Sequence, residues 1–244
     1  MQSASARTEI PARDRLIVAL DTKSVGEADA MVKRIGDAVT FYKVGLELVL
    51  AGGLELVGRL HAEGYRLFLD MKLLDIGNTV EMAVARVAAL DIDFLTIHGL
   101  DTKTVAAAVR GRAGSRLKVL GVTVLTNLDR DDLAEQGLSE LPENLVVRRA
   151  KLITAAGGDG VITSAQEARS VRAAIGAEGL IVTPGIRLAE DPLGDQARVA
   201  TPAFAIANGA DHIVVGRPIT QAADPRAAAT RFQDEIAKAL VLRA

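Results

Sequence analysis

The chain has no cysteine among its 244 residues. This absence excludes disulfide bonds and thiolate metal sites, so that a metal ion would need aspartate, glutamate or histidine ligands, and it fits a reducing compartment. An excess of positive charge is also missing, because 29 basic and 31 acidic side chains leave a formal net charge of −2. The chain therefore lacks the general basic surface on which nonspecific binding of nucleic acid depends.

Long apolar runs are absent as well. No stretch approaches the roughly 20 apolar residues that cross a bilayer, and residues 1–14 lack the apolar centre of a signal peptide. We therefore expect a cytoplasmic protein without a membrane partner. Residues 1–14 are polar, include Pro11 and show no periodicity, which predicts a loosely ordered N-terminal tail in front of one domain over 15–244.

Short apolar runs alternate with longer alanine-rich amphipathic stretches, which is typical of repeated βα units. The runs expected to form strands are 16–20, 39–44, 65–69, 94–97, 117–124, 160–162, 180–182 and 212–215. The stretches expected to form helices are 26–35, 47–63, 79–89, 102–112, 144–156, 165–174, 202–208 and 225–241. Eight such units in about 230 residues predict an α/β fold, a single TIM (β/α)8 barrel over 15–244.

A doubly wound open sheet is the alternative fold, but no G-x-G-x-x-G follows the first expected strand, 16–20. The polar stretch 126–143 after the fifth strand is expected to contain a short extra helix or a mobile lid over the active face. Its acidic run 129–132 is interpreted as a helix start or solvated loop rather than a metal site.

Three charged residues follow directly on the apolar run 65–69: Asp70, Lys72 and Asp75. The period of two along a strand points Asp70 and Lys72 the same way, with Asp75 in the turn beyond. A D-x-K-x-x-D pattern arises by chance in about one chain of this length in twenty. Its position at the end of a buried strand, before a helical stretch, indicates a catalytic site.

Polar residues gather at other strand ends too, which is where TIM barrels build their active sites. Asp21 closes the first strand, Lys43 lies near the end of the second, and Arg187 and Gln196 follow the seventh. By contrast His98, at the end of the fourth strand, is interpreted as a hydrogen-bonded residue of the barrel rim. The two remaining histidines, at positions 61 and 212, are interpreted as structural.

The segment after the eighth strand suits an anion. In this fold a phosphate commonly binds in the loops after strands seven and eight, near the N-terminus of a short helix. Gly216 lets the backbone approach closely, Arg217 supplies a fork of donors, and Pro218 suits the first turn of a helix. Together with Arg187 these residues predict a phosphorylated ligand.

Six segments, in order through almost the whole chain, strongly resemble the orotidine 5′-phosphate decarboxylase family. They are VALD at 18–21, YKVG at 42–45, LDMKLLDIGNT at 69–79, GVTVLT at 121–126, VTPGIR at 182–187 and IVVGRPI at 213–219. The central motif departs from the family at Leu74, where histidine is usual, and at Gly77, where proline is usual. Neither departure removes a charged group.

The resemblance implies decarboxylation of orotidine 5′-phosphate to uridine 5′-phosphate in pyrimidine synthesis, without metal or organic cofactor. Lys72 matches the family's proton donor, and Asp70 would lie against the departing carboxylate and hold Lys72 in place. Lys43 and Asp21 would hold ribose hydroxyls. The charges at Lys43, Asp70, Lys72 and Asp75 would alternate in a row, so that each is paired.

The resemblance further implies a homodimer, in which Asp75 and Thr79 reach into the neighbouring subunit's site. Thr126 matches the position that contacts the pyrimidine. The phosphate-side positions are matched by Arg187, Gln196, Gly216 and Arg217. The rest of the implied substrate-binding segment comprises Met71, Leu73, Leu74, Ile76, Gly77 and Asn78.

Two other functions stay open from the sequence. Magnesium-dependent sugar-phosphate decarboxylases and aldolases of the same superfamily also carry a D-x-K-x-x-D strand end, although the segments 75–79 and 183–187 with Thr126 resemble the nucleotide enzyme more closely. A noncatalytic phosphate-binding barrel would bind nucleotide without turnover. The intact Asp70 and Lys72 argue against that scaffold.

Overall fold

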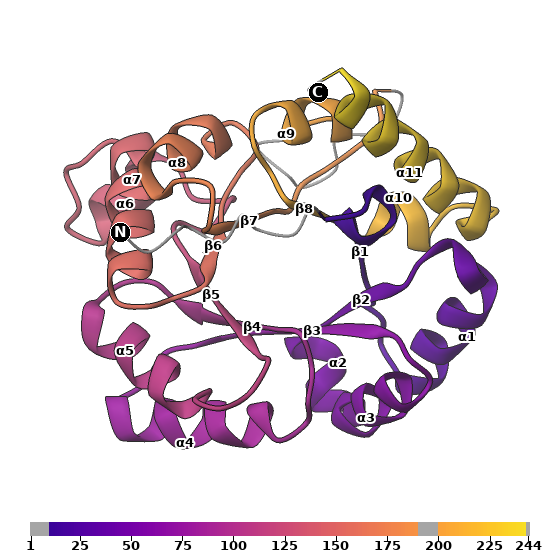
Figure 1. Ribbon diagram of the computed structural model, residues 1–244, viewed down its shortest axis with the longest axis horizontal. Helices are drawn as coiled ribbons and strands as arrows, with labels where there is room; N and C mark the ends of the chain where they lie inside the picture. The colour runs from indigo at the N-terminus through magenta and orange to yellow at the C-terminus, as the bar shows by residue number, and fades with distance from the viewer. Residues whose placement is uncertain (1–9, 190–199, 243–244) are drawn as a thin grey trace, which may run out of the picture.

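The computed structural model describes residues 10–189 and 200–242. Eight parallel strands close into a barrel in the order of the sequence, and the helices surround it (Figure 1). The strands are β1 (Leu16–Ala19), β2 (Phe41–Gly45), β3 (Arg66–Leu73), β4 (Phe94–His98), β5 (Lys118–Val122), β6 (Gly160–Ile162), β7 (Leu180–Thr183) and β8 (His212–Val215). The predicted TIM barrel is confirmed.

Helices follow every strand. The α-helices are α1 (Val25–Ile35), α2 (Leu46–Leu48), α3 (Leu54–Ala62), α4 (Gly77–Ala88), α5 (Thr102–Gly111), α6 (Arg130–Glu135), α7 (Pro142–Ala155), α8 (Ala168–Ile175), α9 (Pro202–Ala207), α10 (Arg217–Thr220) and α11 (Pro225–Val241). Shorter 3-10 and π segments are η1 (Ala12–Arg15), η2 (Gly36–Ala38) and η3 (Val49–Gly53). No helix in the described ranges combines the length and the apolar character that crossing a membrane requires.

Polar side chains set where several helices begin. Five residues that precede a helix accept a hydrogen bond from a backbone N–H in its first turn. They are Ser24, Asp101, Asp129, Thr201 and Asp224. Such a cap satisfies an N–H that has no partner within the helix, and a cap typically stabilises a helix by about 1 kcal/mol.

Alternation along the strands separates two apolar layers. Ile17 of β1 belongs to a cluster inside the barrel together with Phe41, Phe68 and Phe94, whereas its neighbour Leu16 belongs to the larger layer between strands and helices. The ring of Phe94 contacts those of Phe41 and Phe68, with centroids 5.1 and 6.0 Å apart respectively. They fill the interior, so the polar residues that follow on the same strands lie nearer the barrel mouth.

The helix expected over 47–63 is broken into α2, η3 and α3. Gly52 lies within the break and has φ of 93°, a conformation that side chains other than glycine rarely adopt. A Cβ at Gly53 would lie 2.5 Å from the carbonyl oxygen of Leu48, so the two turns approach too closely for any other residue. The Gly52-Gly53 pair thus ends the regular helix that the amphipathic pattern predicted.

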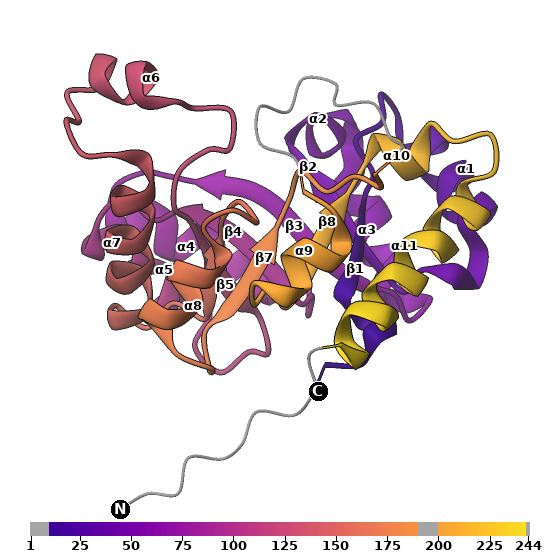
Figure 2. The same cartoon turned by 90° about the horizontal axis from the view of Figure 1, so that it is seen from above.

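The extra helix expected within 126–143 is present as α6. Asp129 accepts hydrogen bonds from the backbone of Asp131 and Asp132, and Asp132 bonds back to Asp129 N, which makes a capping box. The acidic run 129–132 is therefore a helix start, as interpreted. Figure 2 shows α6 standing away from the other helices, on the side of the barrel that also carries α2 and α10.

The N-terminal boundary differs from the expected division at residue 14. Residues 12–15 form η1, and Ile10 contacts the cluster inside the barrel. The backbone carbonyl of Asp14 lies 2.9 Å from Nδ1 of the buried His212. Residues 10–14 therefore belong to the folded barrel, and only residues 1–9 of the predicted tail lie outside the described part.

Candidate active site

A cavity of about 500 Å³ opens at the carboxyl ends of β1, β2, β3, β7 and β8. Its volume lies within the range of small-molecule sites. Four of its lining side chains are cationic and two are carboxylates. The cations are Lys43, Lys72, Arg187 and Arg217, and the carboxylates are Asp21 and Asp70. The sequence predicted all six, and their net positive charge favours an anionic ligand.

Lys43, Asp70 and Lys72 reach the mouth through the alternation of the strands. Lys43 lies two residues after the inward-facing phenylalanine of β2, and Asp70 lies two residues after that of β3. Lys72 continues the same inward face. Along β2 and β3, the inward-facing side chain is therefore apolar at one position and charged two residues later.

These side chains form a continuous chain of ion pairs. Lys43 Nζ lies 2.9 Å from Asp21 Oδ1 and 3.4 Å from Asp70 Oδ2. Lys72 Nζ lies 2.8 Å from Asp70 Oδ1. Because the side chains of Lys43 and Asp70 are only 9% and 14% exposed, little water screens the contact between them.

Their ionisation follows from opposing effects. Burial raises the pKa of Asp70, but the ammonium groups of Lys43 and Lys72 and hydrogen bonds from Lys72 and Thr96 outweigh it, so the pKa lies below its ordinary value. Burial lowers the pKa of Lys43, but the carboxylates of Asp70 and Asp21 raise it by more than burial lowers it. The net shift of the pKa is therefore upward. Both shifts keep the charged forms at neutral pH.

The strand that carries Asp70 and Lys72 is longer and less regular than the run 65–69 predicted. Leu69 pairs with Leu95 and Leu73 pairs with Ile97, so four steps along β3 correspond to two along β4. Such a bulge leaves residues without a ladder partner and bends the strand locally. Lys72 lies within it and has φ of 49°, in the left-handed region that is uncommon for residues with a side chain.

Thr96 is a residue of the site that the sequence reasoning missed. Its hydroxyl donates to Asp70 Oδ1 at 2.8 Å and accepts the backbone N–H of Lys72 at 3.0 Å. The signal that could have revealed it is the spacing of Phe94 and Thr96, which repeats that of Phe68 and Asp70 on the neighbouring strand.

The other end of the cavity is lined by backbone and arginine. Gly185 has φ of 76°, which turns the chain sharply after β7. Arg187 is buried, and its Nη1 donates to the carbonyl of Ile186 at 2.9 Å. Gly216 precedes α10, the short helix that the sequence predicted after β8, and the exposed Arg217 begins it. The loops after β7 and β8 thus add two arginines to the lining of the cavity.

Several predicted residues do not line this cavity. Asp75 is exposed, and its carboxylate accepts the N–H of Ile76 at 2.6 Å. Thr79 is also exposed, and Thr126 is half-buried where the loop towards α6 begins. Gln196 lies outside the described residues. The remaining members of the 71–78 segment are the partly buried Met71 and Leu73, which contact the layer beneath the helices, the exposed Leu74, Ile76 and Asn78, and Gly77 at the start of α4.

The three histidines differ in their burial and their surroundings. His212 is fully buried, which lowers its pKa to about 3 and keeps it neutral. His98 ends β4 half-buried, and burial together with the charges of Lys72 and Arg149 lowers its pKa. Nε2 of His61, on α3, lies 3.7 Å from the carboxylate of Asp91. None of the three lines the cavity at the mouth.

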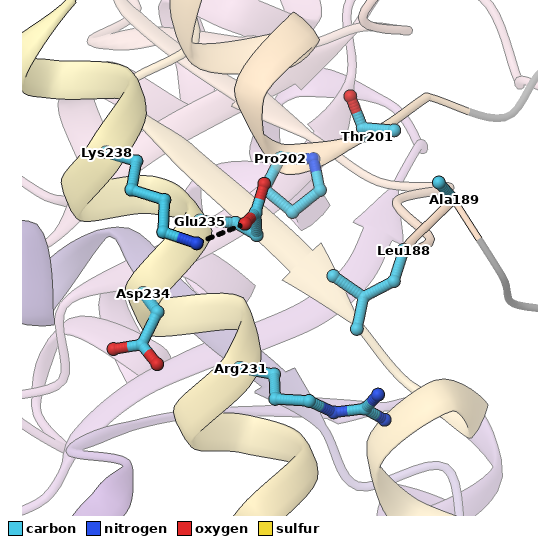
Figure 3. A pocket seen from close by; sticks show the side chains of 8 residues that line it. All are labelled: Leu188, Ala189, Thr201, Pro202, Arg231, Asp234, Glu235 and Lys238. Carbon is cyan, nitrogen blue, oxygen red and sulfur yellow. Dashed lines mark hydrogen bonds and ion pairs between the residues drawn. The ribbon is translucent and has the colours of Figure 1, made fainter.

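Two other cavities differ in their charge. One of about 370 Å³, between α11 and the start of α9, is lined by Arg231 and Lys238 together with Asp234 and Glu235 (Figure 3). Lys238 is paired with Glu235 at 3.0 Å. With equal numbers of cations and carboxylates it shows no preference for an anion.

The third cavity, of about 510 Å³, lies at the opposite end of the barrel, where β3, β4, β5, β7 and β8 begin. Its cations Arg66, Arg116 and Lys118 are each ion-paired with Asp93 or Asp159. In TIM barrels this face contributes to stability rather than to chemistry. The mouth is therefore the candidate active site.

Comparisons with known proteins match nearly the whole chain. The model of the family described as "Orotidine 5'-phosphate decarboxylase / HUMPS family" matches residues 14–232. A protein of Bradyrhizobium sp. (strain BTAi1) named orotidine 5′-phosphate decarboxylase is 53% identical over 235 residues, which is 96% of each chain. One of the same name from Ruegeria pomeroyi is 57% identical over 228 residues, covering 92% of this chain and 95% of that one.

Among solved structures, the crystal structure of orotidine 5′-phosphate decarboxylase from Lactobacillus acidophilus superposes with a TM-score of 0.82 at 37% identity, and covers 91% of this chain and 99% of that one. An uncharacterized conserved protein from Geobacillus kaustophilus gives a TM-score of 0.78 at 34% identity, with the same two coverages.

Proposed function

The chain belongs to the orotidine 5′-phosphate decarboxylase / HUMPS family, and we infer that it converts orotidine 5′-phosphate to uridine 5′-phosphate and carbon dioxide in pyrimidine biosynthesis. One observation carries this conclusion within the site, namely the ion pair between Lys72 and Asp70 in a cavity that Arg187 and Arg217 also line. The magnesium-dependent and noncatalytic alternatives are not favoured by relatives that carry the decarboxylase name over nearly the full length.

The chemistry requires stabilisation of a carbanion. When the bond between C6 and the carboxylate breaks, carbon dioxide leaves and the electron pair stays in an sp² orbital on C6, where the ring delocalises it poorly. A fixed positive charge next to C6 lowers the energy of this state. The ammonium of Lys72 supplies the charge and then donates the proton that completes uridine 5′-phosphate, so neither a metal nor an organic cofactor is needed.

Asp70 has two functions in this proposal. It holds the Lys72 ammonium at 2.8 Å, which fixes the proton donor. It also lies where the substrate carboxylate would approach, and the lowered pKa keeps it ionised there. The charge of the substrate carboxylate disappears as carbon dioxide forms, so repulsion from Asp70 is relieved along the reaction.

The two ends of the cavity suit the two ends of the nucleotide. Asp21 and Lys43, paired at 2.9 Å, are placed to hydrogen bond ribose hydroxyls. Arg187 and Arg217 would bind the phosphate, with Gln196 and the backbone at Gly216. The lining carries two more cations than carboxylates, and the substrate brings a phosphate and a carboxylate. Binding energy from the phosphate would then orient the distant C6.

Thr126 and α6 would act from above the site. Thr126 begins the loop that leads to α6, and α6 stands away from the barrel on the mouth side (Figure 2). Movement of this segment over the bound pyrimidine would exclude water and strengthen the electrostatic contacts with C6.

A homodimer completes the proposed site. Asp75 and Thr79 are exposed beyond β3 and do not line the cavity of their own chain, so they are available to a neighbouring one. Large apolar side chains are also exposed in the segments before and after β3, and a partner chain would cover them. They are Leu46, Leu50, Leu54, Leu74, Ile76 and Met82.

We place the reaction in the cytoplasm, since its charged nucleotides do not cross membranes unaided.

The test is ultraviolet-monitored conversion of orotidine 5′-phosphate by the purified chain in excess chelator. Wild-type protein should turn over, and Lys72→Ala should lose turnover while it still binds uridine 5′-phosphate. Folded wild-type dimer without turnover would overturn the assignment. Turnover that depended on added magnesium would overturn the cofactor-free mechanism.

A further inference from the structure

We propose that Thr96 is a positioning residue for the Asp70–Lys72 pair: its single hydroxyl sets the backbone of the lysine and the carboxylate of the aspartate at the same time. This inference rests on the proposed function, because it concerns how the same site is held ready. Thr96 lies on β4, so it acts across the sheet on two residues of β3.

The hydroxyl of Thr96 acts both as a hydrogen-bond donor and as an acceptor. Thr96 Oγ1 donates its one proton to Asp70 Oδ1 at 2.8 Å and accepts the N–H of Lys72 at 3.0 Å. A hydroxyl has one proton to donate and two lone pairs, so these contacts fix its rotation. Thr96 is fully buried, and therefore water does not compete for either bond.

The position of Thr96 matters because β3 is irregular there. Between the pairs Leu69 with Leu95 and Leu73 with Ile97, β3 bulges away from β4. Lys72 lies in this bulge with φ of 49°. A residue with a side chain needs surrounding contacts to persist in this region. The bond from Lys72 N to Thr96 supplies one from the neighbouring strand.

The second bond selects how Asp70 is turned. Oδ1 receives both Thr96 and Lys72, whereas Oδ2 faces Lys43 at 3.4 Å. A carboxylate that lost the Thr96 contact would keep only its two ammonium partners, which sit at the ends of long side chains. The buried hydroxyl, held on β4, therefore fixes the plane of the carboxylate towards the proton donor.

The groups that contact Asp70 come from three strands: Lys43 on β2, Lys72 on β3 and Thr96 on β4. His98, also on β4, is affected by the charge of Asp70. His98 is charged only if protonated, and burial with Lys72 and Arg149 lowers its pKa. Among these partners Thr96 is the neutral donor, so removing its hydroxyl weakens the preference of Asp70 for the ionised form without changing the formal charge of the site.

The experiment compares Thr96→Val, which keeps the shape and removes the hydroxyl, with Thr96→Ser, which keeps the hydroxyl. We expect Thr96→Val to lower kcat by about tenfold or more, as for a misplaced catalytic group, with KM within about threefold. The acid limb of its kcat profile should move to higher pH. Thr96→Ser should restore kcat to within about threefold of wild type.

Thr104→Val is the matched control. Thr104 is also buried, and its hydroxyl also donates to a carboxylate at 2.8 Å, but that carboxylate belongs to the helix cap Asp101. It should lose stability yet keep wild-type kcat and the wild-type pH profile. Should valine at position 96 prevent folding, Thr96→Ala and Thr96→Ser, which differ by the hydroxyl, give the same comparison.

The outcomes distinguish a failure of the role of Thr96 from a failure of the proposed function. Active wild type with equal kcat in Thr96→Val would overturn the role of Thr96 and leave the proposed function intact. Equal losses in the serine and valine variants would also overturn it, because the hydroxyl would not be the cause. Wild type without decarboxylation would instead count against the proposed function.

Discussion

Lys72 adopts a left-handed backbone conformation, with φ of 49°, and its ammonium still lies 2.8 Å from the carboxylate of Asp70. A non-glycine residue in this region costs about 1–3 kcal/mol, which the surrounding structure must supply. Strain of this kind clusters at active sites. Here it lies at the residue whose ammonium lines the barrel mouth beside a carboxylate on the same strand.

Arg217→Ala should chiefly weaken the binding of phosphorylated ligands. Loss of a charged hydrogen bond corresponds to about 1.5–3 kcal/mol, so the Kd for uridine 5′-phosphate should rise by roughly 10- to 150-fold, while uridine binds as before. Calorimetry with both ligands measures the difference. Arg169→Ala, an exposed arginine on α8 that bonds Asn208, is the control and should bind both normally. Unchanged preference for the nucleotide in Arg217→Ala would refute the phosphate assignment.

Stability should depend on pH through Asp70. Its pKa is below the ordinary 3.8 because Lys43 and Lys72 outweigh burial, so its contribution is fully present above 3.8 and is lost as pH falls through the lower folded value. The difference in unfolding free energy between wild type and Asp70→Asn should therefore be largest near neutral pH and shrink in acid. Urea unfolding over a pH series measures it, with the exposed Asp234→Asn as the control for loss of one charge.

A difference for Asp70→Asn that grew as the pH fell would contradict this direction of linkage. It would mean that the folded state binds a proton at Asp70 more readily than the unfolded chain does, and that burial rather than the two ammonium groups dominates the site.

Hybrid dimers should test whether each site uses two chains. Lys72→Ala and Asp75→Asn are each expected to be inactive alone, since one lacks the proton donor and the other lacks the residue proposed to reach the partner's site. Mixed dimers contain one site with both defects and one with neither, so activity should reappear. Subunit exchange followed by mass measurement verifies mixing. If exchanged dimers stayed inactive, each site would be built from one chain.

Gly45→Ala should disturb the sugar end of the cavity. A Cβ at Gly45 would lie 3.1 Å from Lys43 Nζ and 3.2 Å from Asp21 Oδ1, closer than ordinary van der Waals contact. The pair would have to move, and KM for orotidine 5′-phosphate should rise by roughly tenfold with little loss of thermal stability. Gly26→Ala, where a Cβ would have nothing within 4 Å, is the matched control. Unchanged KM in Gly45→Ala would remove Lys43 and Asp21 from ribose binding.

The break in the helix at Gly52 and Gly53 could not be predicted from the hydrophobic pattern. The amphipathic pattern over 47–63 predicted one helix, since hydrophobic periodicity reports burial and continues across a break. Gly52 with φ of 93° and the contact of Gly53 with Leu48 decide the break through backbone geometry. Periodicity could not supply that information, because a kinked helix buries the same face.

The sequence by itself determined the eight alternating units and the placement of Asp70 and Lys72 at a strand end, since periods of 2 and 3.6 residues follow from local backbone geometry. Only the tertiary structure decided which groups from different strands meet. Asp21 pairs with Lys43, 22 residues away, and Thr96 reaches Asp70, 26 residues away, because barrel closure and the bulge in β3 set the register between strands. The residues that meet across two strands lie far apart in the sequence. No local pattern within either strand therefore shows which residues will meet.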